Sequence, residues 1–591
     1  MVLRVVGVGA LVAAGLAVPL VAGGYAVNIL TQIYLYTFLA GAWNIMALSG
    51  LVSLGHATFF GLGSYATAWL YVTYGLTPAL GWIVGAVLAA AVALGVYWIA
   101  FRCGLRGIYF GGLTLVLAEG FRFAAINSPA LGRSQGLELV GFQVPGGSLY
   151  ALSLLLMAGG MLLTWRLLGS PFGYRLQAVR ENEIAAEALG VNTFRSKLAA
   201  TVLSATLTAM GGAVSALLLR FVEPESDFGL GVSLNVLLGT FLGGVGTVLG
   251  PAVGIGVLFG LREAIAHVGE LLTLGSAGIY AMQQVAYGLI LMGVVLALPE
   301  GLVRRFAAWI PSRRRTRAPQ LGSVGSPVDV SDARSLRVTD GVDDKAPLLA
   351  VVGVTRRFEG LVALRDITFA LSRGEILGII GPNGAGKTTL FNVISGIYPP
   401  TSGGVIFKGR DLTGLAPNEV CRQGIARTFQ IVRPFVTLSV LDNVIIGALG
   451  RAHDLRSARE RSQEILEFVG LGAKREVAAG TLTLQDRKLL EFARALATGP
   501  ELILLDEVMA GLNQGEQERV AETVRRIRNR GVTLLLIEHV MRAVMGLSDR
   551  LVVLDHGVII AEGKPEEIIH DPEVVRVYLG ESPAGHGPRC S

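Results

Sequence analysis

The chain has 591 residues, of which 52% are hydrophobic and 16% are charged, and its mean hydropathy is +0.58. Soluble domains carry about 25% charged residues, so the composition excludes an entirely soluble protein, and the length excludes a single compact core. The three cysteines lie far apart, which excludes a disulfide scaffold, and the 78 glycines follow no Gly-X-Y period, which excludes collagen.

Apolar segments long enough to cross a membrane as helices dominate the N-terminal half. Residues 1–100 contain one formal charge, Arg4. The sequence predicts a polytopic α-helical membrane domain of eight to ten spans over residues 1–311. The first run could instead be a cleaved signal peptide, but similar spans follow it directly. The predicted spans are 5–23, 28–48, 53–73, 79–100, 108–126, 149–168, 198–218 and 280–298, with room for two more in 233–268.

Charge in the loops predicts the orientation of these spans. Arg102 and Arg106 mark one basic loop, and the segment 174–197 is another. The loop 223–227 is acidic. Basic loops stay on the cytoplasmic side, so the acidic loop is expected outside.

Residues 312–347 are rich in Arg, Gly, Ser and Pro without an apolar period, which predicts a flexible linker. From 348 to 580, short Val, Ile and Leu strands alternate with charged helices, which is typical of a mostly parallel α/β domain. Residues 581–591 form a tail. The net charge of +6 equals the number of arginines just after the last span, so it indicates membrane lipids as a partner and no nucleic acid. These arginines are Arg304, Arg305, Arg313, Arg314, Arg315 and Arg317.

A phosphate-binding loop follows the strand predicted at 375–380, and a helix begins at its end. Its glycines let backbone N–H groups surround phosphate oxygens. Lys387 is expected to reach the β and γ phosphates of ATP and to act in catalysis, and the Thr388 hydroxyl to bind Mg²⁺. The predicted ATP-binding residues of the loop are Gly381, Pro382, Asn383, Gly384, Ala385, Gly386, Lys387, Thr388 and Thr389.

Two later strands end in further candidate residues. The apolar strand 502–505 runs into Asp506, a predicted Mg²⁺ ligand, and Glu507, a predicted general base. A second apolar strand, 532–537, is followed by His539, which is expected to contact the γ-phosphate or the attacking water. A buried strand with helix-capping acids is the structural alternative for the first pair.

Residues 348–580 resemble the ATPase subunit of an ATP-binding-cassette (ABC) transporter, and the α/β P-loop fold follows from that resemblance. It implies that Phe358 stacks on adenine and that Gln430 touches Mg²⁺ and senses the nucleotide. The segments 381–389, 510–513 and 578–580 are similar to the branched-chain amino-acid uptake branch of the family.

The family signature, usually Leu-Ser-Gly-Gly-Gln, aligns with residues 482–486, where both glycines are missing. Such ATPases pair head to tail, so this segment is expected to complete the ATP site of a partner. We therefore expect two unequal sites, of which the one using this signature is slow. The segment retains Thr483, Leu484, Gln485 and Asp486.

Residues 1–302 resemble the permease of the same branch in the segments 53–61, 105–110, 243–251 and 299–302. A helix predicted at 181–190 resembles the coupling loop with which importer permeases contact the ATPase near Gln430. A plain interfacial amphipathic helix is the alternative. The coupling residues implied are Glu183, Ala186, Glu187 and Gly190.

These resemblances imply ATP-driven uptake of branched-chain, hydrophobic amino acids across the bacterial inner membrane, with the ATPase domain cytoplasmic. Uptake of urea, short amides or aromatic acids is the alternative within this branch. The expected partners are a second permease and a second ATPase, or a second copy of the chain, and an extracytoplasmic binding protein. An exporter, a soluble ABC protein and a membrane ATPase that signals without transport agree less well with the residues.

Overall fold

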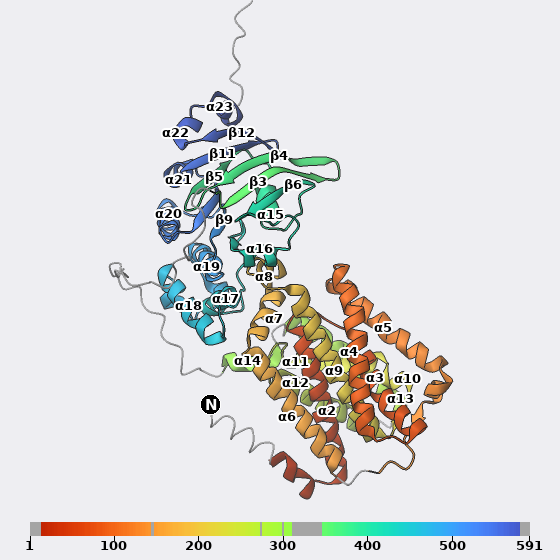
Figure 1. Ribbon diagram of the computed structural model, residues 1–591. Coiled ribbons are helices and arrows are strands. Elements are labelled where there is room, and N and C mark those ends of the chain that lie inside the picture. The colour runs from red at the N-terminus through yellow and green to blue at the C-terminus, as the bar shows by residue number, and fades with distance from the viewer. Residues whose placement is uncertain (1–13, 144–146, 272–274, 298–300, 310–345, 580–591) are drawn as a thin grey trace, which may run out of the picture. The chain divides into compact units, whose positions relative to one another are not determined.

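The computed structural model describes residues 14–143, 147–271, 275–297, 301–309 and 346–579 (Figure 1). Its contacts divide the chain into two compact units. The helical unit comprises residues 1–180 and 194–323, and the sheet unit comprises residues 181–193 and 324–591. The short segment 181–193 therefore belongs with the C-terminal half, although membrane helices flank it in sequence. The predicted linker and tail lie almost entirely outside the described residues.

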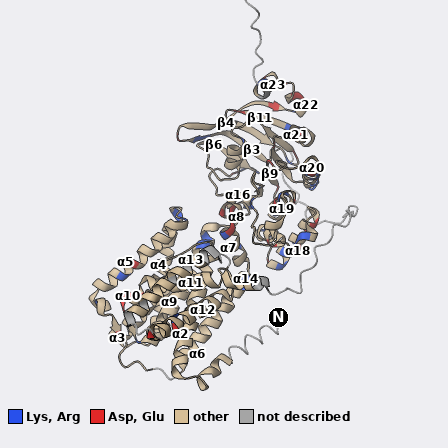
Figure 2. Ribbon diagram, turned by 180° about the vertical axis from the view of Figure 1, so that it is seen from behind, with Lys and Arg blue, Asp and Glu red and all other residues tan. Residues whose placement is uncertain are grey.

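Long helices and one two-stranded ribbon build the helical unit. Figure 2 shows few charged residues on these helices and many in the sheet unit. The elements are α2 (Gly24–Ala47), α3 (His56–Tyr74), α4 (Pro78–Arg102), α5 (Gly107–Asn127), β1 (Leu137–Glu138), α6 (Ser148–Leu168), α7 (Pro171–Glu181), α9 (Thr193–Leu219), β2 (Phe221–Val222), α10 (Pro224–Asp227), α11 (Leu230–Gly243), α12 (Gly250–Leu271), α13 (Ser276–Ala297) and α14 (Gly301–Trp309), with short 3-10 turns at Val18–Leu20, Pro129–Leu131 and Arg133–Gln135.

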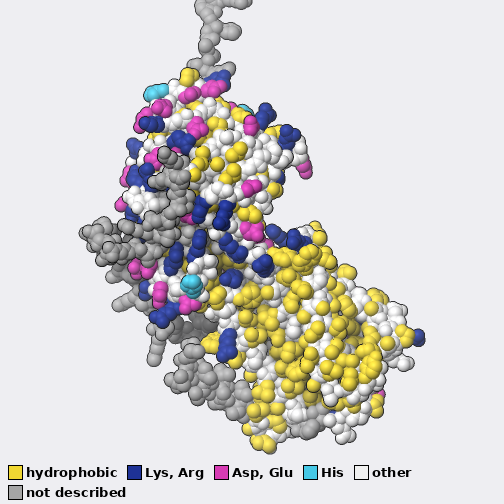
Figure 3. Space-filling model, in the orientation of Figure 1, with side chains coloured by type: hydrophobic (Ala, Val, Ile, Leu, Met, Phe, Trp, Pro, Cys, Tyr) yellow, Lys and Arg dark blue, Asp and Glu magenta, His cyan; other side chains and the backbone are white. Residues whose placement is uncertain are grey.

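Six helices among the described residues are long and apolar enough to cross a membrane. They are α4, α5, α6, α9, the 224–243 segment that joins α10 to α11, and α12. Helices α2, α3 and α13 lie at further predicted spans, whereas residues 5–13 of the predicted span 5–23 are outside the described residues. Hydrophobic side chains cover most of the visible face of the unit (Figure 3). A polytopic membrane domain is confirmed.

Helices α2 and α3 lie at the centre of the helical unit, where α2 contacts α6, α11 and α12, and α3 contacts α4, α5 and α11. Trp43 and Phe59 are fully buried there. Small residues allow this packing: a Cβ at Gly63 would lie 1.9 Å from the Ala209 carbonyl oxygen. The core therefore depends on close backbone approach as well as on large apolar side chains.

One ion-pair cluster joins α5 to α10. Arg122 lies 2.7 Å from the Glu119 carboxylate, as expected for residues one helical turn apart, and 2.6 Å from Glu225. A carboxylate within a span is costly unless it is paired. Arg122 thus compensates the charge of Glu119 within α5 and connects this helix to Glu225 in the acidic loop.

The sheet unit contains a six-stranded and a four-stranded sheet. In the first, the order is β12-β11-β5-β10-β9-β8, and all neighbours are parallel except β11 and β12. In the second, β4-β3-β6-β7, all neighbours are antiparallel. The strands are β3 (Leu349–Phe358), β4 (Leu361–Leu371), β5 (Ile376–Ile380), β6 (Ser402–Phe407), β7 (Arg410–Asp411), β8 (Ile425–Arg427), β9 (Leu502–Asp506), β10 (Thr533–Ile537), β11 (Arg550–Asp555) and β12 (Val558–Gly563).

The six-stranded sheet confirms the mostly parallel α/β expectation, whereas the antiparallel sheet was not predicted. Strands β3 and β4 alternate buried and exposed residues and turn back directly at Glu359 and Gly360, so they form a hairpin. The helices of the unit are α8 (Glu183–Ala188), α15 (Lys387–Ile394), α16 (Pro417–Gln423), α17 (Val440–Ala448), α18 (Leu455–Phe468), α19 (Leu484–Ala497), α20 (Gln514–Arg528), α21 (Met541–Leu547), α22 (Pro565–Ile568) and α23 (Pro572–Leu579), with short 3-10 turns at Gly472–Lys474 and Ala479–Thr481.

Candidate functional site

The predicted phosphate-binding loop turns between β5 and α15, the expected strand–loop–helix setting. Gly381 and Gly386 have φ angles of +153° and +98°, which favour glycine. A Cβ at Gly381 would lie 2.1 Å from the Leu554 carbonyl oxygen, and one at Gly386 would lie 2.6 Å from that of Ala363. The loop thus needs glycine at both positions, and its backbone shape suits a phosphate at the start of α15.

Lys387 is the first residue of α15 and is only 6% exposed. Its Nζ donates to the carbonyl oxygens of Gly381, at 2.7 Å, and Pro382, at 2.8 Å. Burial lowers the pKa of Lys387, and the carboxylates of Glu507 and Asp506 oppose that shift. The ammonium group is therefore held inside the loop that would surround the phosphates. Asn383, Gly384 and Thr388 are exposed, Ala385 is buried and Thr389 is half-buried.

Asp506 ends β9 and is 1% exposed. Its Oδ2 lies 3.1 Å from Arg427 Nη2, whereas its buried Oδ1 has no hydrogen-bond partner among the described residues. Burial raises the pKa of Asp506, and the guanidinium of Arg427 opposes the rise. A buried carboxylate oxygen without a donor suits a cation or its water.

Glu507 follows Asp506 with a φ of +47°, a conformation that non-glycine residues rarely adopt. Its Oε2 accepts a 2.8 Å hydrogen bond from Gln430 Nε2, and its Oε1 lies 2.7 Å from His539 Nε2. The backbone N–H of Glu507 donates to the carbonyl of Ile537 in β10. The structure thus brings together three predicted site residues from three separate segments. Strain of this kind is concentrated at functional positions.

Phe358 lies at the end of β3 and is half-buried. Tyr398 packs edge-on against its ring at 5.2 Å, and the guanidinium of Arg356 lies 4.5 Å from the ring centroid. The aromatic platform therefore has two rings and a cation, of which the sequence predicted only Phe358. Its contact with adenine stays a prediction.

The degenerate signature begins α19. Thr483 is the N-cap, and its hydroxyl accepts a 3.2 Å hydrogen bond from the Asp486 backbone N–H. Asp486 is buried and its Oδ2 lies 2.5 Å from Lys474 Nζ. Leu484 is exposed and Gln485 is half-buried. The side chains of Leu484 and Gln485 therefore stand where the resemblance implies two glycines.

The predicted coupling helix is shorter than expected. Asn182 interrupts the helical conformation between α7 and α8. Its side chain accepts a 2.9 Å hydrogen bond from the Ala185 N–H, so α8 begins only at Glu183. Asn is a strong N-cap, and the ten-residue helix predicted from 181 was therefore wrong at its start. Glu187 accepts a 2.6 Å hydrogen bond from Thr193, and Ala186 is fully buried.

Segment 181–193 packs on α16 within the sheet unit. Arg422 Nη2 donates to the Gly190 carbonyl at 3.2 Å, and the Thr437 hydroxyl donates to Glu181 at 2.6 Å. Ile184 and Ala188 line a small cavity with side chains that include Arg427, the partner of Asp506. The segment therefore makes its contacts within the sheet unit, and its role as a coupling loop stays a prediction.

Sequence reasoning missed Arg427, Lys488 and Glu491. Arg427 is the last residue of β8 and pairs with Asp506, and the two others lie on α19. No local sequence pattern marks these three residues, because a buried charge can be recognised only once its partners have been placed.

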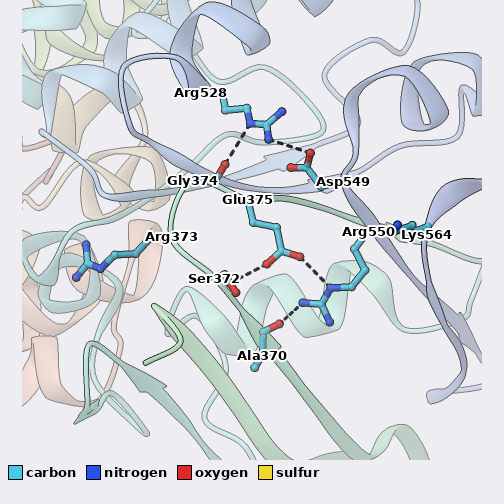
Figure 4. A pocket seen from close by; sticks show the side chains of 9 residues that line it. All are labelled: Ala370, Ser372, Arg373, Gly374, Glu375, Arg528, Asp549, Arg550 and Lys564. Atoms are coloured by element: carbon cyan, nitrogen blue, oxygen red, sulfur yellow. Dashed lines mark hydrogen bonds and ion pairs between the residues drawn. The ribbon is translucent and has the colours of Figure 1, made fainter. Parts of the chain in front are cut away.

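A cavity of about 620 Å³ in the sheet unit lies away from the phosphate loop, beside the first residues of β5 and β11 (Figure 4). Arg528 pairs with Asp549 across it, and Arg550 pairs with Glu375. Two ion pairs therefore lie in the lining, which contains none of the predicted ATP-site residues.

The comparisons with known proteins cover both units. Residues 25–298 match the family model described as the permease component of branched-chain amino acid transport systems. Residues 364–510 match the ABC transporter model, and residues 558–584 match the model of branched-chain amino acid ATP-binding cassette transporters.

The high-affinity branched-chain amino acid transport ATP-binding protein LivG of Salmonella typhimurium is 41% identical over 254 residues, which is 40% of this chain and 99% of that protein. BraF of Pseudomonas aeruginosa, with the same description, is 37% identical over 254 residues, again 40% and 99%. The chain belongs to the branched-chain amino acid ABC transporter family. A solved nucleotide-free cassette from an ABC transporter is 33% identical, with a TM-score of 0.37, and covers 40% of this chain and 100% of that one.

The transporter therefore carries its permease and its ATPase on one chain, with family matches on both sides of the linker region. It is a multi-pass membrane protein, and its C-terminal half is an ATPase that binds ATP and couples hydrolysis to transport.

Proposed function

We propose that this transporter imports branched-chain amino acids across the bacterial inner membrane, with the ATPase in the cytoplasm. The observation that supports the substrate most directly is that the permease half and the end of the ATPase half each match models named for these amino acids. The curated relatives of the ATPase half are described in the same terms. None of these descriptions names urea, amides or aromatic acids.

The proposed complex contains a second permease and a second ATPase, either different chains or a second copy, and an extracytoplasmic binding protein that selects the substrate. Two features support this composition. The signature segment lies at the N-terminus of α19, and in the head-to-tail arrangement of the family it would serve a nucleotide held by another cassette. The segment 181–193 packs on the sheet unit as a permease coupling loop would.

The proposed ATP site is built around Lys387, with Asp506, Thr388 and Gln430 as ligands of Mg²⁺. The unpartnered Oδ1 of Asp506 fits a hydrated cation. Among the described residues no group of three or more His, Cys, Asp or Glu side chains could hold a metal by itself, so phosphate oxygens would complete the ligand set. Mg²⁺ in this position neutralises charge on the phosphates.

The proposed division of work at the site follows from its hydrogen bonds. Glu507 is the general base that takes a proton from the attacking water. His539 and Gln430 hold the two oxygens of that carboxylate, so they orient it and place their own polar groups beside the γ-phosphate position. Lys387 stabilises the negative charge that develops on the transferred phosphoryl group.

Deletion of the gene in its own host tests the substrate. Uptake of labelled leucine should fall and should return with the wild-type chain but not with Lys387→Ala. Uptake of labelled urea, acetamide and benzoate should stay unchanged in the same cells. A loss of one of these instead of leucine uptake would establish the alternative substrate class, and no change in any would refute import of these compounds.

A further inference from the structure

Helix α19 buries four charged side chains, of which Lys488, Glu491 and Arg494 lie beside the proposed ATP site. Lys488 is 4% exposed, Glu491 5% and Arg494 4%, although they share the helix with a largely apolar face. Burial of a charge is costly unless hydrogen bonds and opposite charges compensate it. The groups that compensate these charges therefore show what the helix holds in place.

Lys488 contacts the catalytic segment. Its Nζ donates a 2.9 Å hydrogen bond to the backbone carbonyl of Glu507, the residue with the strained φ of +47°. Burial lowers the pKa of Lys488, while the carboxylates of Glu491, Glu538 and Glu507 favour its charged form. Glu507 is thus fixed by its backbone on one side and by Gln430 at its side chain.

Glu491 contacts the loop that carries Gln430. Its Oε2 accepts a hydrogen bond from the Phe429 N–H at 3.3 Å, and its Oε1 accepts one from the Arg433 N–H at 3.0 Å. One carboxylate therefore ties both ends of the segment 429–433. Arg494 adds a 2.7 Å hydrogen bond from its Nη1 to the Arg433 carbonyl.

We propose that Lys488 and Glu491 are positioning residues, through which the signature helix aims Glu507 and Gln430 at the ATP bound by the same chain. The proposal rests on the roles proposed above for those two residues. Thr483 of the signature is the N-cap of α19, so a rigid displacement of the helix N-terminus moves the side chains that hold Glu507 and the Gln430 loop. Helix α19 thereby connects the signature segment, which is expected to face a partner cassette, with Glu507 and Gln430 in the ATP site of the same chain.

Lys488→Met tests the proposal in the full-length transporter purified with its partners. The variant keeps the length of the apolar stem and removes the donor to Glu507. We expect kcat for ATP hydrolysis to fall about 10- to 100-fold, since misplacement on the order of 1 Å can cost that much. The Kd for ATP should stay within about twofold of the wild-type value, because the phosphate loop is untouched. Lys488→Arg, which restores a donor, should recover part of kcat.

Arg451→Met is the matched control, because Arg451 also donates to a backbone carbonyl, that of Thr498, but outside the site. It should leave kcat and Kd unchanged. Glu491→Gln, which keeps size and shape, is the second variant, and it replaces Lys488→Met if that chain fails to fold. It should lower kcat with unchanged ATP affinity, because a neutral acceptor holds Phe429 and Arg433 less tightly.

Glu507→Gln distinguishes the proposed role of Glu507 from the proposed positioning role of Lys488 and Glu491. If this variant hydrolyses ATP at the wild-type rate, the proposed role of Glu507 is wrong. If it abolishes hydrolysis while Lys488→Met and Glu491→Gln keep the wild-type kcat, the positioning proposal is overturned. Loss of ATP affinity and of thermal stability in parallel with kcat would overturn it too, because a purely structural role predicts that pattern.

Discussion

His539 Nε2 lies 2.7 Å from Glu507 Oε1, although the residues are 32 positions apart in the chain. The cause is strand register: β9 and β10 are parallel neighbours, and Ile537 lies opposite Asp506. Residues just past the carboxyl ends of neighbouring parallel strands meet at one edge of the sheet. The pairing of imidazole and carboxylate is therefore a consequence of two adjacent apolar strands ending together.

His539→Ala should lower kcat for ATP hydrolysis about 10- to 100-fold with little change in ATP affinity, because Glu507 loses one of its two side-chain contacts. His539→Gln retains a polar group and should lose less. Phosphate release and ATP binding measured on both variants check this. A wild-type kcat in the alanine variant would contradict the proposed orientation of Glu507.

Gly386→Ala should destabilise the ATPase more than Gly384→Ala. Both residues have positive φ, +98° and +85°, but a Cβ at Gly386 would meet the Ala363 carbonyl oxygen at 2.6 Å, whereas that at Gly384 meets nothing within 4 Å. Strain of this kind costs on the order of 1–3 kcal/mol, or about 2–10 °C in melting temperature. Thermal unfolding compares the two variants. Equal melting temperatures would show that Ala363 moves away from the new Cβ without lowering the free energy of unfolding.

Gly190→Cys should form a disulfide with the native Cys421, because a Cβ at Gly190 would lie 3.5 Å from the Cys421 sulfur. The variant is made with Cys103 and Cys590 changed to serine and oxidised mildly. A mobility shift on non-reducing gels should appear and should disappear in Cys421→Ser. Absence of the disulfide would contradict the packing of segment 181–193 on α16. Ala186 is fully buried and is a poorer position for such a test.

Glu538 should make the stability of the sheet unit depend on pH. Burial raises the pKa of Glu538 from 4.5 to about 7, so its contribution to stability is complete below pH 4.5 and is lost as the pH rises through 7. The expected loss between pH 6 and pH 8 is about 1 kcal/mol. Melting temperatures of the wild type and Glu538→Gln at both pH values measure it. The wild type alone should lose this increment, and an equal loss in the variant would refute the assignment.

The parts of the site that local sequence determines were predictable. The phosphate loop needs only its own glycines and the flanking strand and helix, and Asp506, Glu507 and His539 lie at strand ends that hydrophobicity marks clearly. The contacts of Gln430 with Glu507 depend on how distant loops fold together. No local sequence pattern predicts that Gln430 and Glu507 lie within hydrogen-bond distance.

The features that were missed depend on competition between local signals. Segment 181–190 has good helix composition, yet the N-cap preference of Asn182 divides it. The β3–β4 hairpin lacks the Asn-Gly turn that usually marks one. From sequence alone, Lys488 and Glu491 would be predicted to face solvent on a helix. Their burial can be recognised only once their partners have been placed.

The packing of segment 181–193 on the sheet unit has a consequence for assembly. Residues 310–345 connect the described parts of the chain, and 36 residues extend at most about 125 Å. A cassette confined within that radius has an effective concentration of about 0.2 mM or more near the segment it binds. A docking contact with a dissociation constant as weak as about 0.1 mM therefore stays mostly occupied at any concentration of the transporter. Each permease is also synthesised together with one ATPase that can bind its segment 181–193.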